Sequence, residues 1–170
     1  MSTSQYALNF GLLAYILWAN LGSKPVTRRR LTLPLLLVAV AAGIYLRSIP
    51  TLGHDLDLEV AGAVAGALLG ILAGVLVRVG RDNTGRVVMR AGAAYAALWI
   101  AVIGGRMVFA YGATNWFGPA IGRFSMSHQI TGGPAWTAAF VLMALAMVLA
   151  RVAVTGIAAA RATRPAAVTA

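Results

Sequence analysis

The sequence predicts an all-α protein, a polytopic bundle of five transmembrane helices. Of its 170 residues, 60% are hydrophobic and only 11% are charged, and the mean hydropathy is +0.81. Several apolar runs approach the roughly 20 residues that a helix needs to cross a hydrocarbon core of about 30 Å. The basic residues gather at the ends of these runs, which is the arrangement expected at membrane surfaces.

The composition also excludes several functions. The formal net charge of +10 could suggest nucleic acid as a partner, but basic residues that flank apolar runs predict membrane topology and no nucleic-acid surface. Cysteine is absent, which excludes thiolate metal sites, disulfide exchange and haem attachment through cysteine. The two histidines have no spacing that indicates a metal or haem site, so neither a metal nor a cofactor is predicted.

Five apolar segments divide the chain, and together they predict a single bundle over residues 1–155. Polar connectors separate the segments, and one of them contains the turn-like sequence DNTG at residues 82–85. The alanine-rich residues 156–170 are expected to form a flexible cytoplasmic tail. The predicted spans are residues 6–21, 31–49, 58–77, 87–111 and 135–154.

The distribution of lysine and arginine predicts the orientation of the bundle. Eleven of the 14 basic residues lie in the connectors after the first and third spans or near the C-terminus. Three, Arg47, Arg106 and Arg123, belong to the opposite side. Because basic residues accumulate on the cytoplasmic side, we expect the N-terminus outside and the C-terminus in the cytoplasm. The expected partner is the lipid bilayer, with anionic headgroups beside the cytoplasmic arginines.

Four glycines with a spacing of four residues mark the third span. Positions four apart lie on one side of a helix, so these glycines predict a groove of bare backbone, a glycine zipper, along one face. Small residues at this spacing let a second membrane helix approach closely. We expect the groove to contact the fourth span near Gly92, or the third span of a second copy in a homo-oligomer. The predicted packing glycines of the third span are Gly62, Gly66, Gly70 and Gly74.

Polar residues gather near the predicted outer face. Glu59 opens the third span, and Arg106 lies at a similar depth in the fourth, so we expect these two side chains to form an ion pair. Tyr95 and Trp99 share a helix face with Arg106. These residues are predicted to line an outward-facing, ligand-binding cavity with Trp116 and His128, and residues 112–133 are long enough to form a lid or a re-entrant segment over it.

Structural interpretations of the same residues remain open. Asp55 and Asp57 precede a helix start, where carboxylates serve as caps. Arg106 could extend its guanidinium to the interface without a partner, and Trp116 could belong to an interfacial aromatic belt. The two histidines, His54 and His128, are more readily interpreted as hydrated loop residues than as ligands.

The segment from Glu59 to Tyr111 resembles the CcdC-like family of integral membrane proteins. The likeness comprises the glycine-rich span, a basic turn that ends in RVVMRAG, the aromatic span AAYAALWIAVIGGR and the following MVFAY. Its matched polar positions are Glu59, Arg90, Trp99 and Arg106. The family is named for a gene beside cytochrome c maturation genes, and the resemblance implies a membrane topology without implying a reaction.

Two functions are consistent with this pattern. The first is an accessory or small-ligand-binding membrane bundle with an outward-facing polar and aromatic pocket. The second is an intramembrane enzyme on a lipophilic, isoprenoid-like substrate, with Glu59 or Asp55 as general acid and aromatic side chains around a developing cation. A transporter or channel is less favoured, because the sequence lacks inverted repeats and mid-membrane charges.

Overall fold

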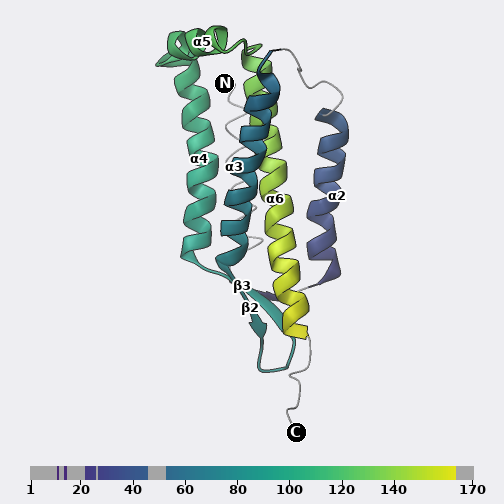
Figure 1. Cartoon of the computed structure of the whole chain (residues 1–170). Coiled ribbons are helices and arrows are strands. Elements are labelled where there is room, and N and C mark those ends of the chain that lie inside the picture. The colour runs from purple at the N-terminus through teal and green to yellow at the C-terminus, as the bar shows by residue number, and fades with distance from the viewer. Residues whose placement is uncertain (1–10, 12–13, 15–21, 26, 46–52, 164–170) are drawn as a thin grey trace.

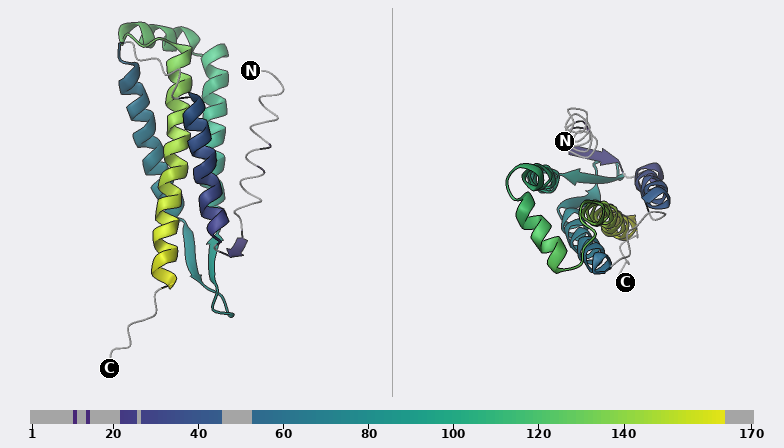
Figure 2. Two further views of the ribbon diagram at one scale, coloured as in Figure 1. Left: turned by 90° about the vertical axis from the view of Figure 1, so that its right-hand side faces the viewer. Right: turned by 90° about the horizontal axis from the view of Figure 1, so that it is seen from above.

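The computed structural model describes residues 11, 14, 22–25, 27–45 and 53–163, and this part of the chain forms five helices and a small sheet (Figure 1). The helices run side by side, except for α5, which lies across one end of the bundle (Figures 1 and 2). In chain order the elements are β1 (Gly22–Pro25), α2 (Arg28–Tyr45), α3 (Asp55–Val75), β2 (Val77–Arg81), β3 (Val87–Ala91), α4 (Ala93–Asn115), α5 (Gly118–Ser127) and α6 (Gly133–Thr163).

Three helices, α3, α4 and α6, are long and apolar enough to cross a membrane. With 21, 23 and 31 residues they extend about 32, 35 and 46 Å, compared with about 30 Å for a hydrocarbon core. Large apolar side chains such as Leu68 and Val75 on α3 and Val108 on α4 are exposed on their outer faces. In water such surfaces would be unfavourable, whereas in a bilayer they contact lipid.

The helix boundaries differ from the predicted ones at several points. The predicted fourth span began at Val87, but residues 87–91 form strand β3 and α4 starts at Ala93. The predicted connector 112–133 contains the helix α5, and residues 156–163 of the predicted tail belong to α6. The predicted first span, residues 6–21, the end of the second span and residues 164–170 fall outside the described residues or almost wholly so.

The all-α prediction missed a three-stranded antiparallel sheet with the strand order β1-β3-β2. Strands β2 and β3 form a hairpin because VRVGR and VVMRA are rich in valine and flank the turn at residues 82–85. Within the turn, Oδ1 of Asp82 accepts hydrogen bonds from the Thr84 hydroxyl (2.6 Å), the Thr84 amide (2.8 Å) and the Arg86 amide (2.9 Å). These bonds, led by that of the Thr84 hydroxyl, lower the pKa of Asp82, and Gly85 supplies the positive φ of 78°.

The sheet brings three basic segments to one end of the molecule. Strand β1 comes from the first predicted connector and pairs with β3, which directly follows the third connector. Arg81 of β2 reaches the last turn of α6, where its Nε donates to the Ala162 carbonyl at 3.2 Å and its Nη2 to that of Thr163 at 3.4 Å. This guanidinium satisfies carbonyls that lack a partner within the helix, which explains why α6 continues into the predicted tail. We call this end of the bundle the sheet end and the opposite one the α5 end.

The glycine face of α3 packs on α6. A Cβ atom at Gly62 would lie 2.5 Å from the carbonyl oxygen of Ala139, and one at Gly74 would lie 2.6 Å from Cβ of Val154. Gly66 and Gly70 lie in the same way against the carbonyls of Met143 and Met147. The expected contact with the fourth span is therefore wrong, and Gly92 has no atom within 4 Å of where its Cβ would be. The two helices run in the same direction, and their backbones approach more closely than a side chain permits.

Larger side chains connect α4 to α6. The core of the sheet end is a cluster around Tyr95, which is completely buried, with Trp99 and Ile103 of α4 and Met147 of α6. Toward the other end, the ring of Phe109 lies 5.1 Å from that of Phe140. Aromatic and methionine side chains fill the interface between α4 and α6. In contrast, α3 contacts α6 through its backbone. The α4 side of the bundle can therefore enclose a cavity.

Candidate functional site: a cavity beneath α5

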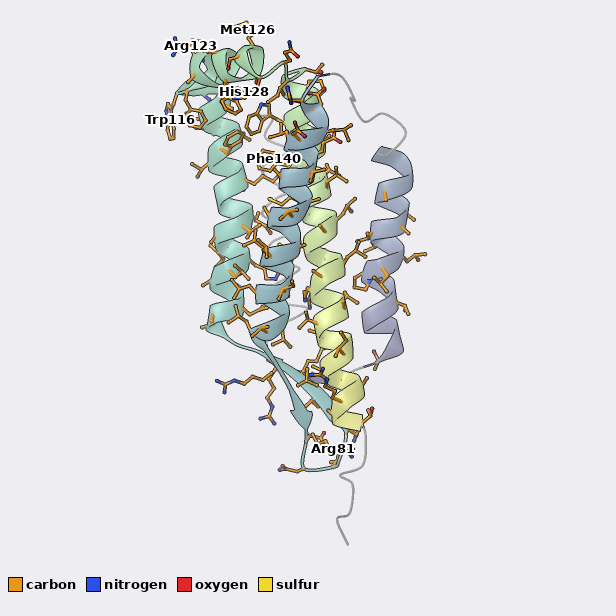
Figure 3. All side chains as sticks on the ribbon, viewed as in Figure 1. Arg81, Trp116, Arg123, Met126, His128 and Phe140 are labelled. Carbon is orange, nitrogen blue, oxygen red and sulfur yellow. The ribbon has the colours of Figure 1, made fainter. Side chains whose placement is uncertain are left out.

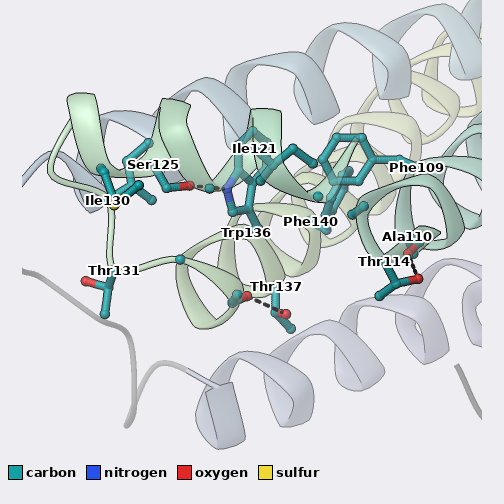
Figure 4. A pocket seen from close by; sticks show the side chains of 16 residues that line it. Phe109, Ala110, Thr114, Ile121, Ser125, Ile130, Thr131, Trp136, Thr137 and Phe140 are labelled. Carbon is teal, nitrogen blue, oxygen red and sulfur yellow. Dashed lines mark hydrogen bonds between the residues drawn. The ribbon is translucent and has the colours of Figure 1, made fainter. Parts of the chain in front are cut away.

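A cavity of about 600 Å³ lies at the α5 end, between the last turns of α4, the helix α5 and the first turns of α6 (Figure 4). Its volume is within the range of about 300–1,000 Å³ that is typical of small-molecule sites. The lining is formed by Phe109, Ala110, Ala113 and Thr114 of α4; Gly118, Ile121, Gly122, Ser125 and Met126 of α5; and Ile130, Thr131, Gly132, Gly133, Trp136, Thr137 and Phe140.

Aromatic rings form one wall of the cavity. The ring of Phe109 lies 5.2 Å from Trp136 and 5.1 Å from Phe140, and Phe117 follows at 5.9 Å. The planes of the Phe140 and Phe109 rings are inclined at 62°, which is an edge-to-face geometry. Rings that support one another in this way form a rigid apolar surface.

Most side-chain hydrogen-bond donors in the lining already donate to other groups of the protein. The indole Nε1 of Trp136 donates to Oγ of Ser125 at 3.2 Å, as Figure 4 shows. The Thr114 hydroxyl donates to the Tyr111 carbonyl and the Thr137 hydroxyl to the Gly133 carbonyl, both at 2.9 Å. None of the lining residues is charged. The cavity therefore offers one uncommitted hydroxyl hydrogen, that of Ser125, and no countercharge.

A buried carboxylate fastens the loop beside the cavity. Asp55, the first residue of α3, has no exposed surface, and its Oδ1 accepts a hydrogen bond from the Thr131 amide at 2.8 Å. Its Oδ2 accepts a second one from the Thr131 hydroxyl. The His54 amide donates to the Gln129 carbonyl at 3.3 Å, and Gln129 has a positive φ of 51°. These contacts, which we call the Asp55–Thr131 latch, position the α5–α6 loop.

Two predicted ligand-binding residues are far from this cavity. Tyr95 and Trp99 belong to the first two turns of α4 and thus to the sheet end, where their rings lie 6.2 Å apart. The guanidinium of Arg151 lies 5.3 Å from the centre of the Tyr95 ring, a cation–π contact. The Tyr95 hydroxyl and the Trp99 indole nitrogen are buried, and neither finds a hydrogen-bond partner among the described residues. The expected single cavity with Glu59 and Arg106 is wrong.

The predicted ion pair between Glu59 and Arg106 is also wrong. Glu59 is 3% exposed, and its Oε1 has no hydrogen-bond partner in the described part of the chain. Arg106 is exposed and lies over the ring of Phe140, 5.9 Å from its centre. Glu59 lies on the side of α3 that faces α6. Arg106 belongs to α4, whose large side chains contact α6 at a different interface. The two residues are therefore apart. Neither residue lines the cavity.

The last two predicted ligand-binding residues lie around α5 without reaching the cavity. Trp116 is 67% exposed and packs edge-on against Tyr111 at 5.2 Å. His128 is the C-cap residue that follows α5, and its ring stacks on Phe124 at 4.2 Å. Figure 3 shows Trp116, Arg123, Met126 and His128 gathered at this end of the molecule and Arg81 at the other. Among the described residues no group of three histidine or acidic side chains could hold a metal ion.

The residues that line the cavity were not predicted from the sequence, although a lid over residues 112–133 is expected from the length of that segment. Trp136 has the position of an interfacial aromatic residue, and Ser125, Thr131 and Thr137 belong to no recognisable motif. A usable signal was present in α5. Pro119 in its first turn favours a helix start, and Ile121 and Ser125 lie on one side of the helix with exposed Arg123 on the other. An amphipathic segment of this kind predicts that one side of the helix faces the bundle.

The chain is not matched by any known protein-family model, by any curated protein or by any solved structure. The resemblance to the CcdC-like family therefore stays a prediction.

Proposed function

We propose that this protein is a small integral membrane protein that binds a neutral lipophilic molecule in the cavity beneath α5. The observation that carries this proposal is a cavity of about 600 Å³ with an aromatic wall and no charged lining residue. An anionic or cationic ligand would lose its hydration there without gaining a countercharge, which is costly in a medium of low dielectric constant. An alcohol or a ketone loses much less.

The polar groups define which functional group fits. The Ser125 hydroxyl can donate one hydrogen bond while it accepts that of Trp136, and the threonine oxygens can still accept. A ligand with one hydroxyl or carbonyl group satisfies this set. Neither carboxylate expected as a general acid, Asp55 or Glu59, is among the lining residues. Binding, as by an accessory or carrier protein, is therefore the function that we propose.

Tryptophan fluorescence tests the cavity. In a variant with Trp18→Phe, Trp99→Phe and Trp116→Phe, Trp136 is the sole remaining indole. Farnesol, a neutral isoprenoid alcohol, should change its emission in a saturable way. Ala110→Phe should fill the cavity and weaken binding by about tenfold or more, a loss of about 1.4 kcal/mol. Exposed Ala97 lies on the same helix outside the lining, so Ala97→Phe is the matched control.

Three outcomes would overturn the ligand proposal. The first is a linear, unsaturable response to farnesol, as for partition into the surrounding detergent. The second is equal weakening by Ala110→Phe and Ala97→Phe. The third is tighter binding of the corresponding isoprenoid carboxylic acid, which would contradict the argument from the uncharged lining.

The proposed topology has five spans, with the N-terminus outside and the C-terminus in the cytoplasm. It is supported by the meeting of β1, the β2–β3 hairpin and the end of α6 at one basic end of the molecule. Reporter fusions after Lys24 and after Asp82 should give cytoplasmic signals, and fusions near Gly53 and Gly122 should give external ones. An external signal after Asp82 would invert the proposed orientation, and the cavity would then face the cytoplasm.

A further inference from the structure

The sheet end carries two arginines that face each other without a counterion among the described residues. In the register of the hairpin, Arg78 of β2 is directly opposite Arg90 of β3, and on the other side of β3 the partner of Arg90 is Ser23. Both arginine side chains are exposed. Like charges directly opposite each other on neighbouring strands repel, so the arrangement lacks an internal electrostatic reason.

No salt bridge joins these arginines to an acidic side chain among the described residues. Of its four carboxylate side chains, Asp55, Asp57 and Glu59 belong to the first turns of α3 at the α5 end. The fourth, Asp82, uses its Oδ1 for the three hydrogen bonds of the hairpin turn. Within the described part of the chain the single salt bridge joins His54 to Asp57, also at the α5 end.

The two faces of the sheet distinguish Arg78 and Arg90 from Arg81. Side chains alternate between the faces of a strand, so Val77, Val79 and Arg81 share one face. Val77 belongs to the buried core, Val79 packs against it, and Arg81 donates to the last carbonyls of α6. Arg78 and Arg90 lie on the opposite face, where Val88 is buried but both arginine side chains are exposed. Arg81 stabilises the fold, and Arg78 and Arg90 remain available to an external anion.

The position of the pair suits the headgroup layer of a membrane. Arg78 follows the last residue of α3 by three positions, and Arg90 precedes the first residue of α4 by three. At about 3.3 Å per strand residue, each lies within about 10 Å of the end of a membrane-spanning helix. The headgroup layer on one side of a bilayer has a comparable thickness, about 5–8 Å. Guanidinium groups are also suited to the oxygens of a phosphate, to which they donate two hydrogen bonds at once.

We propose that Arg78 and Arg90 form a binding site for the phosphate group of an anionic membrane phospholipid. The lipid supplies a negative charge between the two arginines, and it relieves the repulsion between the two strands. The site is separate from the cavity beneath α5 and does not depend on the function proposed for that cavity.

Lipid selectivity in reconstituted protein tests this site. The full chain is placed in phosphatidylcholine bilayers that contain spin-labelled phosphatidylglycerol, and the immobilised fraction of the label is measured against spin-labelled phosphatidylcholine. Wild-type protein should prefer phosphatidylglycerol. Each of the single variants Arg78→Gln and Arg90→Gln should reduce this preference by about fivefold or less. A factor of about five corresponds to about 1 kcal/mol, the contribution of one basic residue at an anionic surface. The double variant should lose the contribution of both.

The controls separate this site from general basicity and from misfolding. Arg123→Gln removes an exposed arginine at the α5 end and should leave the preference unchanged. Arg78→Lys with Arg90→Lys keeps both charges, so it should retain most of the preference if the double glutamine variant fails to fold. The preference should also fall at high salt, as expected for exposed charges.

Two results would overturn the proposal. One is a double glutamine variant that folds and prefers phosphatidylglycerol as strongly as wild-type protein does. The other is complete displacement of the spin-labelled lipid by millimolar inorganic phosphate, which would identify a site for a free anion instead of a lipid.

Discussion

Gly66→Leu should cause the largest loss of stability among the glycine substitutions on the α6-facing side of α3. The position faces the Met143 carbonyl so closely that even a Cβ atom would overlap the backbone of α6. A leucine would therefore separate the two helices along their whole contact. Overpacking of a core costs about 1–3 kcal/mol when side chains can move aside, and we expect at least the upper value because backbone cannot. Unfolding of the purified protein in one detergent measures the effect.

Gly105→Leu is the matched control for this prediction. It makes the same change within a helix, but no atom lies within 4 Å of its Cβ position, and the residue is exposed. The gain in helix propensity should leave it neutral or slightly more stable, by up to about 1 kcal/mol. Equal stability of Gly66→Leu and Gly105→Leu would contradict the close contact between α3 and α6.

Asp55→Ala should give the second large effect. It removes both acceptors of the Asp55–Thr131 latch from a position with no exposed surface, and it leaves the Thr131 amide without its partner. Hydrogen bonds to a charged group contribute about 1.5–3 kcal/mol, so we expect a loss of this size in the free energy of unfolding. Because Ile130 and Thr131 also line the cavity, farnesol should bind this variant more weakly than wild-type protein.

Asp57→Ala distinguishes the latch from a general effect of acidic residues at this helix start. Asp57 is two residues away, and its side chain is 78% exposed and paired only with His54 at 2.7 Å. Surface pairs contribute about 0–1 kcal/mol, so Asp57→Ala should be much milder. Thr131→Val, which removes the hydroxyl and retains the amide, should lie between the two. Equal losses for Asp55→Ala and Asp57→Ala would argue against the latch.

The two ends of the molecule divide its proposed tasks. The α5 end combines an uncharged cavity with a loop fastened by Asp55, and the sheet end combines a packed core with arginines that lack a counterion among the described residues. The helix α6, about 46 Å long, connects them and packs on the glycine face of α3. The glycine contact therefore supports both the cavity and the sheet.

Helices long and apolar enough to cross a membrane were predictable from sequence, because the hydropathy of a continuous run does not depend on its neighbours. The structure has three helices long and apolar enough to cross a membrane, α3, α4 and α6. The four-residue glycine spacing also predicted a close helix contact, since spacing alone determines which residues share a face. Even the separation of Tyr95 from Arg106 was accessible: 11 residues correspond to about 17 Å along a helix, too far for one small site.

What only the tertiary structure decided is which elements meet. A groove of bare backbone accepts any helix with a suitable surface, so the glycines of α3 could not distinguish α6 from α4. The hairpin was hidden because its valines extend an apolar run that resembles the start of a helix, and the pairing of β1 with β3 is needed to stabilise it. The cavity is the space that remains between α4, α5 and α6 once their aromatic side chains have set the distance between them. Such a space depends on the arrangement of three segments, which no local pattern in the sequence records.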